Sequence, residues 1–190
     1  MSVAGFVGLG VVAVVVIYAI TIYNSLVQNK HAVAKAWANI DVLLKQRHDE
    51  LPKLIEVCKQ YKQFEATTLE RVVAARAQVH EARTKQDVEA LGEAENALRR
   101  GVGRLFAVAE AYPELHANEN FMQLQTRISQ LENGIADRRE FYNESVNINN
   151  VCIEQFPDVV VARLFGFAAK PMLDFSSVEK ADVDIKSLFA

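Results

Sequence analysis

The chain has 190 residues and a formal net charge of -3 at pH 7, a size that suits about one domain with its own buried core. Its 21 basic and 24 acidic residues nearly balance, which excludes the global positive charge typical of nucleic-acid-binding proteins. It has only eight glycines and four prolines, and its many helix-favouring residues predict an all-α fold.

The first element is an uncharged segment from Val3 to Ile22. Twenty helical residues rise about 30 Å, the thickness of a bilayer's hydrocarbon core, and a soluble helix is rarely apolar on every face for so long. A cleavable signal peptide normally carries Lys or Arg before its apolar run, whereas only Met1 and Ser2 stand here. The sequence therefore predicts a transmembrane anchor over residues 1–23.

The flanks of this segment predict its orientation. Basic residues follow it and none precedes it, so we expect a single-pass membrane protein with its N-terminus outside and its C-terminal domain in the cytoplasm. Ala4 and Gly8 lie one helical turn apart, a spacing that lets two membrane helices approach closely. These small residues indicate a homo-oligomer, although they also suit ordinary packing against lipid.

Residues 24–157 are expected to form an antiparallel bundle of three to four long helices. Apolar residues at steps of three and four run from Val33 to Val79, with Pro52 inside the stripe. Proline lacks the amide proton that a helix interior uses, so we expect Pro52 either to kink the helix or to begin a new one, with an interruption near residues 47–51. The stripe ends near Arg83, where Thr84 and Asp87 have the spacing of a capping box.

A further helix is predicted from Val88 to Tyr112, in which Gly101 and Gly103 would mark a close helix crossing. A loop follows, and Asn118 is a candidate N-cap for the last long helix. That helix carries seam residues from Phe121 to Phe156 and is ended by Pro157.

Residues 158–190 are predicted to form an apolar fold-back segment and a polar tail. Val159 to Phe167 is too short to span a membrane, so it should pack on the bundle or on a neighbour. Beyond Pro171 the chain turns polar, and the closing Leu188 and Phe189 could dock.

The stretch "RHDELP", Arg47 to Pro52, concentrates residue types that catalysis uses. On a helix, however, the adjacent His48 and Asp49 point about 100° apart and cannot form a base and its orienting partner. We therefore expect Arg47, His48 and Asp49 to pair around the proline, and Asp41 to pair with Lys45 one turn away. The alternative is an enzyme or metal-dependent hydrolase that uses His48 and Asp49, with Glu50 as a further candidate.

No metal or cofactor site is predicted. The histidines lack the helical spacings of di-iron bundles and zinc proteases, and Cys58 and Cys152 belong to no ligand motif. We expect the two cysteines to be single thiols on apolar faces, in a reducing compartment.

A second group of candidate residues lies in the stretch "RREFYNESVNINNVCIEQFP" and comprises Arg139, Tyr142, Asn143 and Asn149. Asn149 falls on the apolar seam, where its amide must find a partner, as a seam asparagine does when it fixes register in coiled coils. The alternative is a sensor or adaptor whose pocket, lined by Tyr142 and Asn149, binds a small ligand or peptide.

Several motifs in order resemble the LemA family of bacterial membrane proteins, over about residues 18–171. The motifs are Tyr23-Asn24, Ile40-Asp41-Val42, Arg47-His48-Asp49 with Pro52, "YPELHANENFMQLQ", "LENGIADRREFYN" and "FPDVVVARLFGF". The resemblance implies an anchor in the bacterial inner membrane, a cytoplasmic helical bundle and no established catalytic activity.

The magnetosome protein MamQ is similar to this chain in the same way. The resemblance also implies a candidate partner, which is a membrane metalloprotease or another membrane protein. Together with the anchor, it leads us to expect a non-enzymatic scaffold that contacts membrane lipids, self-associates and binds no nucleic acid.

Overall fold

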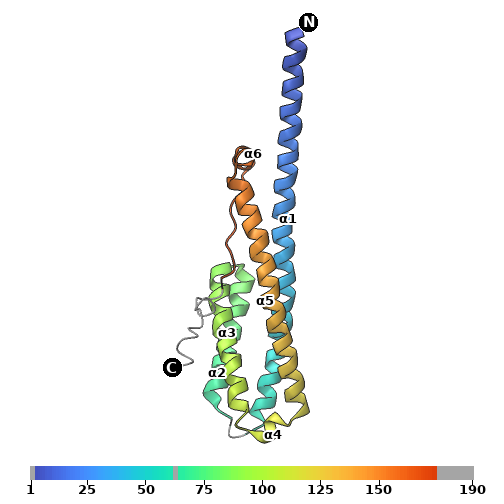
Figure 1. Ribbon diagram of the computed structural model, residues 1–190. Coiled ribbons are helices and arrows are strands. Elements are labelled where there is room, and N and C mark those ends of the chain that lie inside the picture. Colours follow the sequence, from blue (N-terminus) through green and yellow to red (C-terminus); the bar gives the residue numbers. More distant parts are fainter. Residues whose placement is uncertain (1–2, 62–63, 175–190) are drawn as a thin grey trace, which may run out of the picture. The chain divides into compact units, whose positions relative to one another are not determined.

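The computed structural model describes residues 3–61 and 64–174, apart from the side chain of Ala4, and these residues form helices and no strand. The helices are α1 (Val3–Lys59), α2 (Ala66–Lys85), α3 (Val88–Ala109), α4 (Pro113–His116), α5 (Glu119–Glu154) and α6 (Asp158–Leu164) (Figure 1). The predicted all-α fold is confirmed. The predictions for Leu188 and Phe189 fall outside the described residues.

Two compact units share these helices. Of the described residues, the anchor unit comprises those up to Asn39 and those from Glu140 to Met172, and the bundle unit comprises those from Ile40 to Arg139 together with Leu173 and Asp174. Both α1 and α5 contribute one part to each unit.

The bundle unit contains the later part of α1, helices α2, α3 and α4, and the earlier part of α5. Within it α2 and α3 run antiparallel as neighbours (Figure 1). Its apolar residues recur at the three- and four-residue steps seen in the sequence, and their side chains fill the interior. Fully buried members are Ile40, Leu44, Leu51, Leu54, Leu91, Leu98, Leu105, Leu115, Phe121 and Ile128.

The expectation that a new helix could begin at Pro52 is wrong. Helix α1 continues through Pro52 to Lys59, and α2 begins at Ala66. Proline leaves one helical carbonyl without its amide donor, so this helix can continue if another group supplies the hydrogen bond. The candidate site below identifies that group.

The predicted helix starts are close to those observed. The Asp87 side chain accepts a hydrogen bond from the amide of Ala90 at 3.0 Å and caps α3, whereas Thr84 remains inside α2. The Asn118 side chain accepts from the amide of Phe121 at 3.1 Å, as expected of an N-cap.

Two glycines of α3 lie at close approaches, and only one of them was predicted. A Cβ atom at Gly101 would lie 3.3 Å from Cγ2 of Val72, so the expected crossing occurs there, but one at Gly103 would meet nothing within 4 Å. A Cβ atom at Gly92 would lie 2.3 Å from the backbone oxygen of Asp174. Gly92 therefore gives the returning C-terminal segment its path across α3.

In the anchor unit, the first part of α1 exposes its apolar side chains from Val3 to Tyr18, apart from that of Ala4. Within residues 3–61 and 64–174, α1 is the one helix long and apolar enough to cross a membrane. The segment after Pro157 folds back as predicted. Helix α6 packs on α1 through a cluster formed by Ile22, Leu26, Ile153, Val161 and Ala162.

Candidate functional site

The backbone carbonyl freed by Pro52 belongs to His48, four residues earlier in α1. Arg76 of α2 supplies the missing donor, because its Nε atom donates to the His48 carbonyl oxygen at 3.0 Å. A side chain from a neighbouring helix thus replaces the amide that proline lacks. This contact explains how α1 continues where the sequence predicted an interruption.

The His48 ring uses the same arginine. Its Nε2 lies 2.7 Å from Nη2 of Arg76, and because a guanidinium can only donate, Nε2 must be the acceptor of a neutral imidazole whose proton is on Nδ1. Burial lowers the pKa of His48, and Arg76 and His80 lower it further. The His80 ring stacks on it with centroids 4.8 Å apart. His48 is therefore held in its uncharged form by the groups around it.

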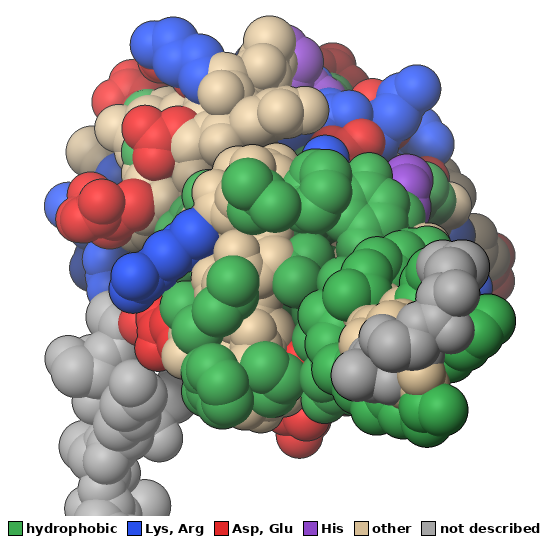
Figure 2. All heavy atoms as spheres, turned by 90° about the horizontal axis from the view of Figure 1, so that it is seen from above, with side chains coloured by type: hydrophobic (Ala, Val, Ile, Leu, Met, Phe, Trp, Pro, Cys, Tyr) green, Lys and Arg blue, Asp and Glu red, His purple; other side chains and the backbone are tan. Residues whose placement is uncertain are grey.

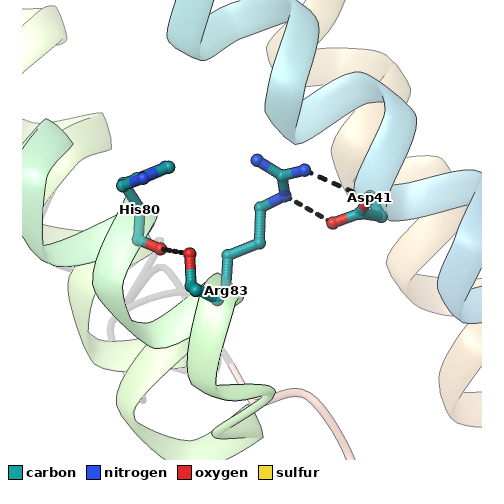
Figure 3. Close-up of polar contacts among 4 residues, drawn as sticks. Asp41, His80 and Arg83 are labelled. Carbon is teal, nitrogen blue, oxygen red and sulfur yellow. Dashed lines mark hydrogen bonds and ion pairs between the residues drawn. The ribbon is translucent and has the colours of Figure 1, made fainter.

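Asp41 also pairs across helices, which corrects the expected contact with Lys45. The Arg83 side chain of α2 points at the Asp41 carboxylate of α1 (Figure 3), with Nε donating to Oδ1 and Nη2 donating to Oδ2 at 3.2 Å. Such a bidentate pair fixes the orientation of both planar groups. It also raises the pKa of Arg83, and the ion pair joins α1 to α2.

Arg47 lies on the interior side of α1 and forms a buried ion pair with Glu95 of α3, in which the side chains are only 3% and 4% exposed. Glu132 of α5 lies nearby: burial raises the pKa of its carboxyl, Glu95 raises it further, and Arg47 and Arg99 oppose these effects. Within the described residues, Nε of Arg47 and Oε1 of Glu132 are buried without a hydrogen-bond partner.

These groups line a small polar cavity of about 70 Å³, together with Asn96, Arg99, Asn133, Ile135, Ala136 and Arg139. Ligand pockets usually measure about 300–1,000 Å³, so this cavity is too small for an ordinary metabolite. It has room for a few waters, which would satisfy the two unpartnered atoms. Of the residues singled out from the sequence, Arg47 and Arg139 meet here.

The remaining residues of the "RHDELP" stretch do not complete a catalytic group. Asp49 is exposed, and Glu50 accepts a hydrogen bond from Nζ of Lys53 at 2.9 Å. Among residues 3–61 and 64–174, no three His, Cys, Asp or Glu side chains are placed to hold a metal ion. Cys58 is buried away from any such role, and burial raises the pKa of its thiol to about 12.

Tyr142 and Asn149 are both buried in the anchor unit, where the C-terminal segment occupies their surroundings. The Tyr142 hydroxyl donates to the carbonyl oxygen of Pro171 at 3.0 Å, and its ring packs on Trp37 with centroids 5.6 Å apart. Asn149 donates to the side chain of Asn150 at 3.2 Å. The neighbouring Asn143 is half-buried.

Asn150 performs the task that the sequence suggested for Asn149. Its amide nitrogen donates to the carbonyl oxygen of Lys170, and its amide oxygen accepts from the Lys170 backbone, both at 2.9 Å. The two hydrogen bonds hold the returning chain as a neighbouring β-strand would. Asn149 therefore holds the side chain of Asn150, and Asn150 in turn binds the backbone of Lys170.

Sequence reasoning also missed Arg76, Glu95 and Glu132. Glu95 stands on the stripe of Leu91 and Leu98, and Glu132 lies four residues after Ile128 on α5. A charged residue at a seam position is the signal that could have identified both as buried. No comparable signal exists for Arg76, whose role depends on a carbonyl of another helix.

Comparison with known proteins agrees with the resemblance described above. A family model described as the LemA family matches residues 36–186. Magnetosome protein MamQ 2 of Paramagnetospirillum magneticum is 33% identical over 79 residues, which are 42% of this chain and 29% of that protein. Protein LemA of Metamycoplasma hominis is 26% identical over 167 residues, 87% of this chain and 74% of its own. The chain thus spans less than a third of the magnetosome relative.

Proposed function

Because the chain belongs to the LemA family, we propose that it is a membrane-anchored, non-enzymatic scaffold that self-associates and organises membrane or membrane proteins. The N-terminal apolar helix and these relatives fit a membrane-anchored protein. Its proposed partners are membrane lipids, further copies of the chain and another membrane protein, a metalloprotease among them. No nucleic acid is among the proposed partners.

The observation that carries this proposal is that the polar side chains of the bundle unit pair with one another across its helices. Arg47 and His48, from the stretch that suggested chemistry, and Asp41 each hold one helix of the bundle unit to another. An enzyme needs such groups poised toward a substrate, whereas a scaffold needs them to make its helices rigid. The bundle unit is therefore better suited to presenting surfaces than to transforming a ligand.

The membrane and the orientation belong to the same proposal: the bacterial inner membrane, with the N-terminus outside and the bundle unit in the cytoplasm. Exposed Lys30, Lys35 and Lys45 follow the apolar run, as expected on the cytoplasmic side. In spheroplasts, Ser2→Cys should react with a membrane-impermeant maleimide, whereas Gln28→Cys should react only after lysis, both in a Cys152→Ser background. The reverse labelling would contradict the orientation.

Self-association is tested at the small residues of α1. A Cβ atom at Gly8 or at Gly10 would meet nothing within 4 Å of the chain, so leucine fits at either position of an isolated copy. Gly8 shares a face with Ala4, whereas Gly10 lies about 200° around the helix from Gly8. Gly8→Leu should reduce the size of the detergent-solubilised full-length protein, and Gly10→Leu should leave it unchanged.

A wild-type protein that is strictly monomeric, with no co-purifying partner, would sink the scaffold proposal. Equal sizes of wild type and Gly8→Leu, both oligomeric, would keep self-association and place its interface elsewhere.

A further inference from the structure

Large apolar side chains on α6 and at its two ends are exposed in the described structure. Phe156 is 83% exposed, Val160 59% and Leu164 77%, and Phe165, whose ring also contacts Tyr23, is 58% exposed. Seen from above, hydrophobic side chains gather over α6 beside those of α1 (Figure 2). So many large apolar side chains on seven helical residues and their flanks indicate a surface that water does not normally face.

We propose that α6 is a second membrane contact, which inserts these side chains into the boundary between lipid head groups and acyl chains on the side where α1 leaves the bilayer. The helix is far too short to span a membrane, so it would lie in the interface beside α1. This inference rests on the proposed membrane anchor and adds a second point of attachment to it.

The contacts of α6 with α1 set its depth. On its inner side, Val161 and Ala162 pack with Ile22, the last residue of the apolar segment that begins at Val3, and with Leu26. The ring of Tyr23 contacts those of Phe165 and Phe167, with centroids 4.7 and 5.9 Å apart. Residues 23–26 lie within about 6 Å of the end of the apolar segment along the helix axis. All of these contacts lie inside the anchor unit.

The chemistry of α6 matches this depth better than it matches a protein partner. Aromatic side chains are enriched at membrane interfaces, and Tyr23, Phe165 and Phe167 form an aromatic group at the end of the anchor. Arg163 is exposed on the same helix, where its apolar stem can follow the acyl boundary while its guanidinium reaches lipid phosphate. Continuity with the lipid-facing surface of α1 identifies the occupant as the same bilayer.

The fold holds α6 at this position. Gly166 has a φ of +70°, a left-handed conformation that favours glycine, and it lets the amide of Phe167 donate to the carbonyl of Ala162 at 2.9 Å. The chain after this turn is clamped to α5 by Asn150 and by Tyr142. The turn at Gly166 and the hydrogen bonds from Asn150 and Tyr142 thus hold α6 in place.

The test uses tryptophan fluorescence in vesicles of phosphatidylcholine and phosphatidylglycerol that contain nitroxide-labelled lipids. The chain has one tryptophan, so Trp37→Phe gives a background into which single tryptophans can be placed. Leu164→Trp reports on α6, and Ile17→Trp reports on the anchor. Phe141→Trp is the control, because its neighbour Tyr142 packs on Trp37, about 22 Å past Ile22 along α1.

We expect Leu164→Trp to be quenched at least half as strongly as Ile17→Trp, most by labels near the head group, and Phe141→Trp to stay at background. If Ile17→Trp is quenched and Leu164→Trp is not, the inference is overturned while the proposed membrane anchor stands. A blue-shifted but unquenched Leu164→Trp would indicate that protein, and not lipid, covers α6. If neither is quenched, anchor and inference both fail. Phe156→Trp replaces Leu164→Trp if that variant loses helicity.

Discussion

A buried charge costs a folded protein free energy unless its partner is well placed, and the interior of the bundle unit holds Arg47, Glu95 and Glu132 together. Arg47 satisfies Glu95, while Glu132 has a buried oxygen without a protein partner. At the scale of single residues, the interior of the bundle therefore depends on one arginine, which pairs with Glu95 and acts electrostatically on Glu132. Removing it should cost more than removing any surface pair.

Arg47→Met is expected to destabilise the bundle unit by about 3–5 kcal/mol, because it leaves Glu95 buried and uncompensated. Adding Glu95→Leu should recover much of this loss, since an apolar pair can replace a buried ion pair. Denaturant unfolding of the solubilised protein measures both, and Lys85→Ala, which removes the exposed pair with Glu81, should change nothing measurable. A double variant as unstable as the single would contradict the pairing.

Glu132→Gln should remove one contribution to the pH dependence of the free energy of unfolding. Because the folded pKa of Glu132 is raised above its ordinary 4.5, the folded state binds the proton more readily than the unfolded state. The contribution of Glu132 to stability is therefore present below about pH 4.5 and is lost as pH rises through the folded pKa. Glutamine cannot ionise, so the variant should gain stability relative to wild type at pH 7.5 compared with pH 5.

Unfolding of both proteins at the two pH values gives this difference directly, and the effect of His48, which is common to both, cancels. A difference between variant and wild type that does not change with pH would show that Glu132 is not strained by burial.

At the scale of elements, the course of α1 depends on a hydrogen bond from α2, and the path of the C-terminal segment depends on a glycine of α3. Sequence periodicity predicted the helices well, because steps of three and four recur over long stretches. It could not predict that α1 continues, since Arg76 lies 28 residues from His48. For the same reason the sequence did not predict Arg83 as the partner of Asp41, since the two residues lie 42 positions apart, and it indicated the nearby Lys45 instead.

Arg76→Ala is expected to cost about 1–3 kcal/mol, because the His48 carbonyl then has neither an amide nor a guanidinium donor. In a Pro52→Ala background the amide returns, and the same change should cost less by on the order of 1 kcal/mol. Arg71→Ala, exposed on the same helix, is the control. Additive effects of Pro52→Ala and Arg76→Ala would show that the proline and the arginine are not linked.

Two glycines of α3 should respond oppositely to alanine. Gly103→Ala is expected to stabilise the helix by up to about 1 kcal/mol, because its site is open. Gly92→Ala should instead displace the segment at Leu173 and Asp174, since its Cβ atom would collide with a backbone oxygen. Hydrogen exchange at Leu173, which is buried in wild type, should accelerate in Gly92→Ala only. Equal protection in both variants would contradict the close approach.

At the scale of the whole molecule, the sequence predicted the all-α fold, the apolar N-terminal helix and the fold-back of α6, since each follows from apolar residues along a continuous stretch. The polar site was predicted only in part. Arg47 and His48 were identified, but their partners Glu95 and Arg76 come from other helices, and a tertiary contact leaves no periodic signal. In the proposed scaffold, these internal pairs make the bundle rigid, and the apolar surfaces contact the membrane and the partners.

The most direct test of this account is the number of chains in a membrane particle. Full-length protein extracted with its native lipids into nanodiscs, and weighed by native mass spectrometry, should contain several copies of the chain or a stoichiometric second membrane protein. Particles that hold a single copy and no other protein would contradict the scaffold.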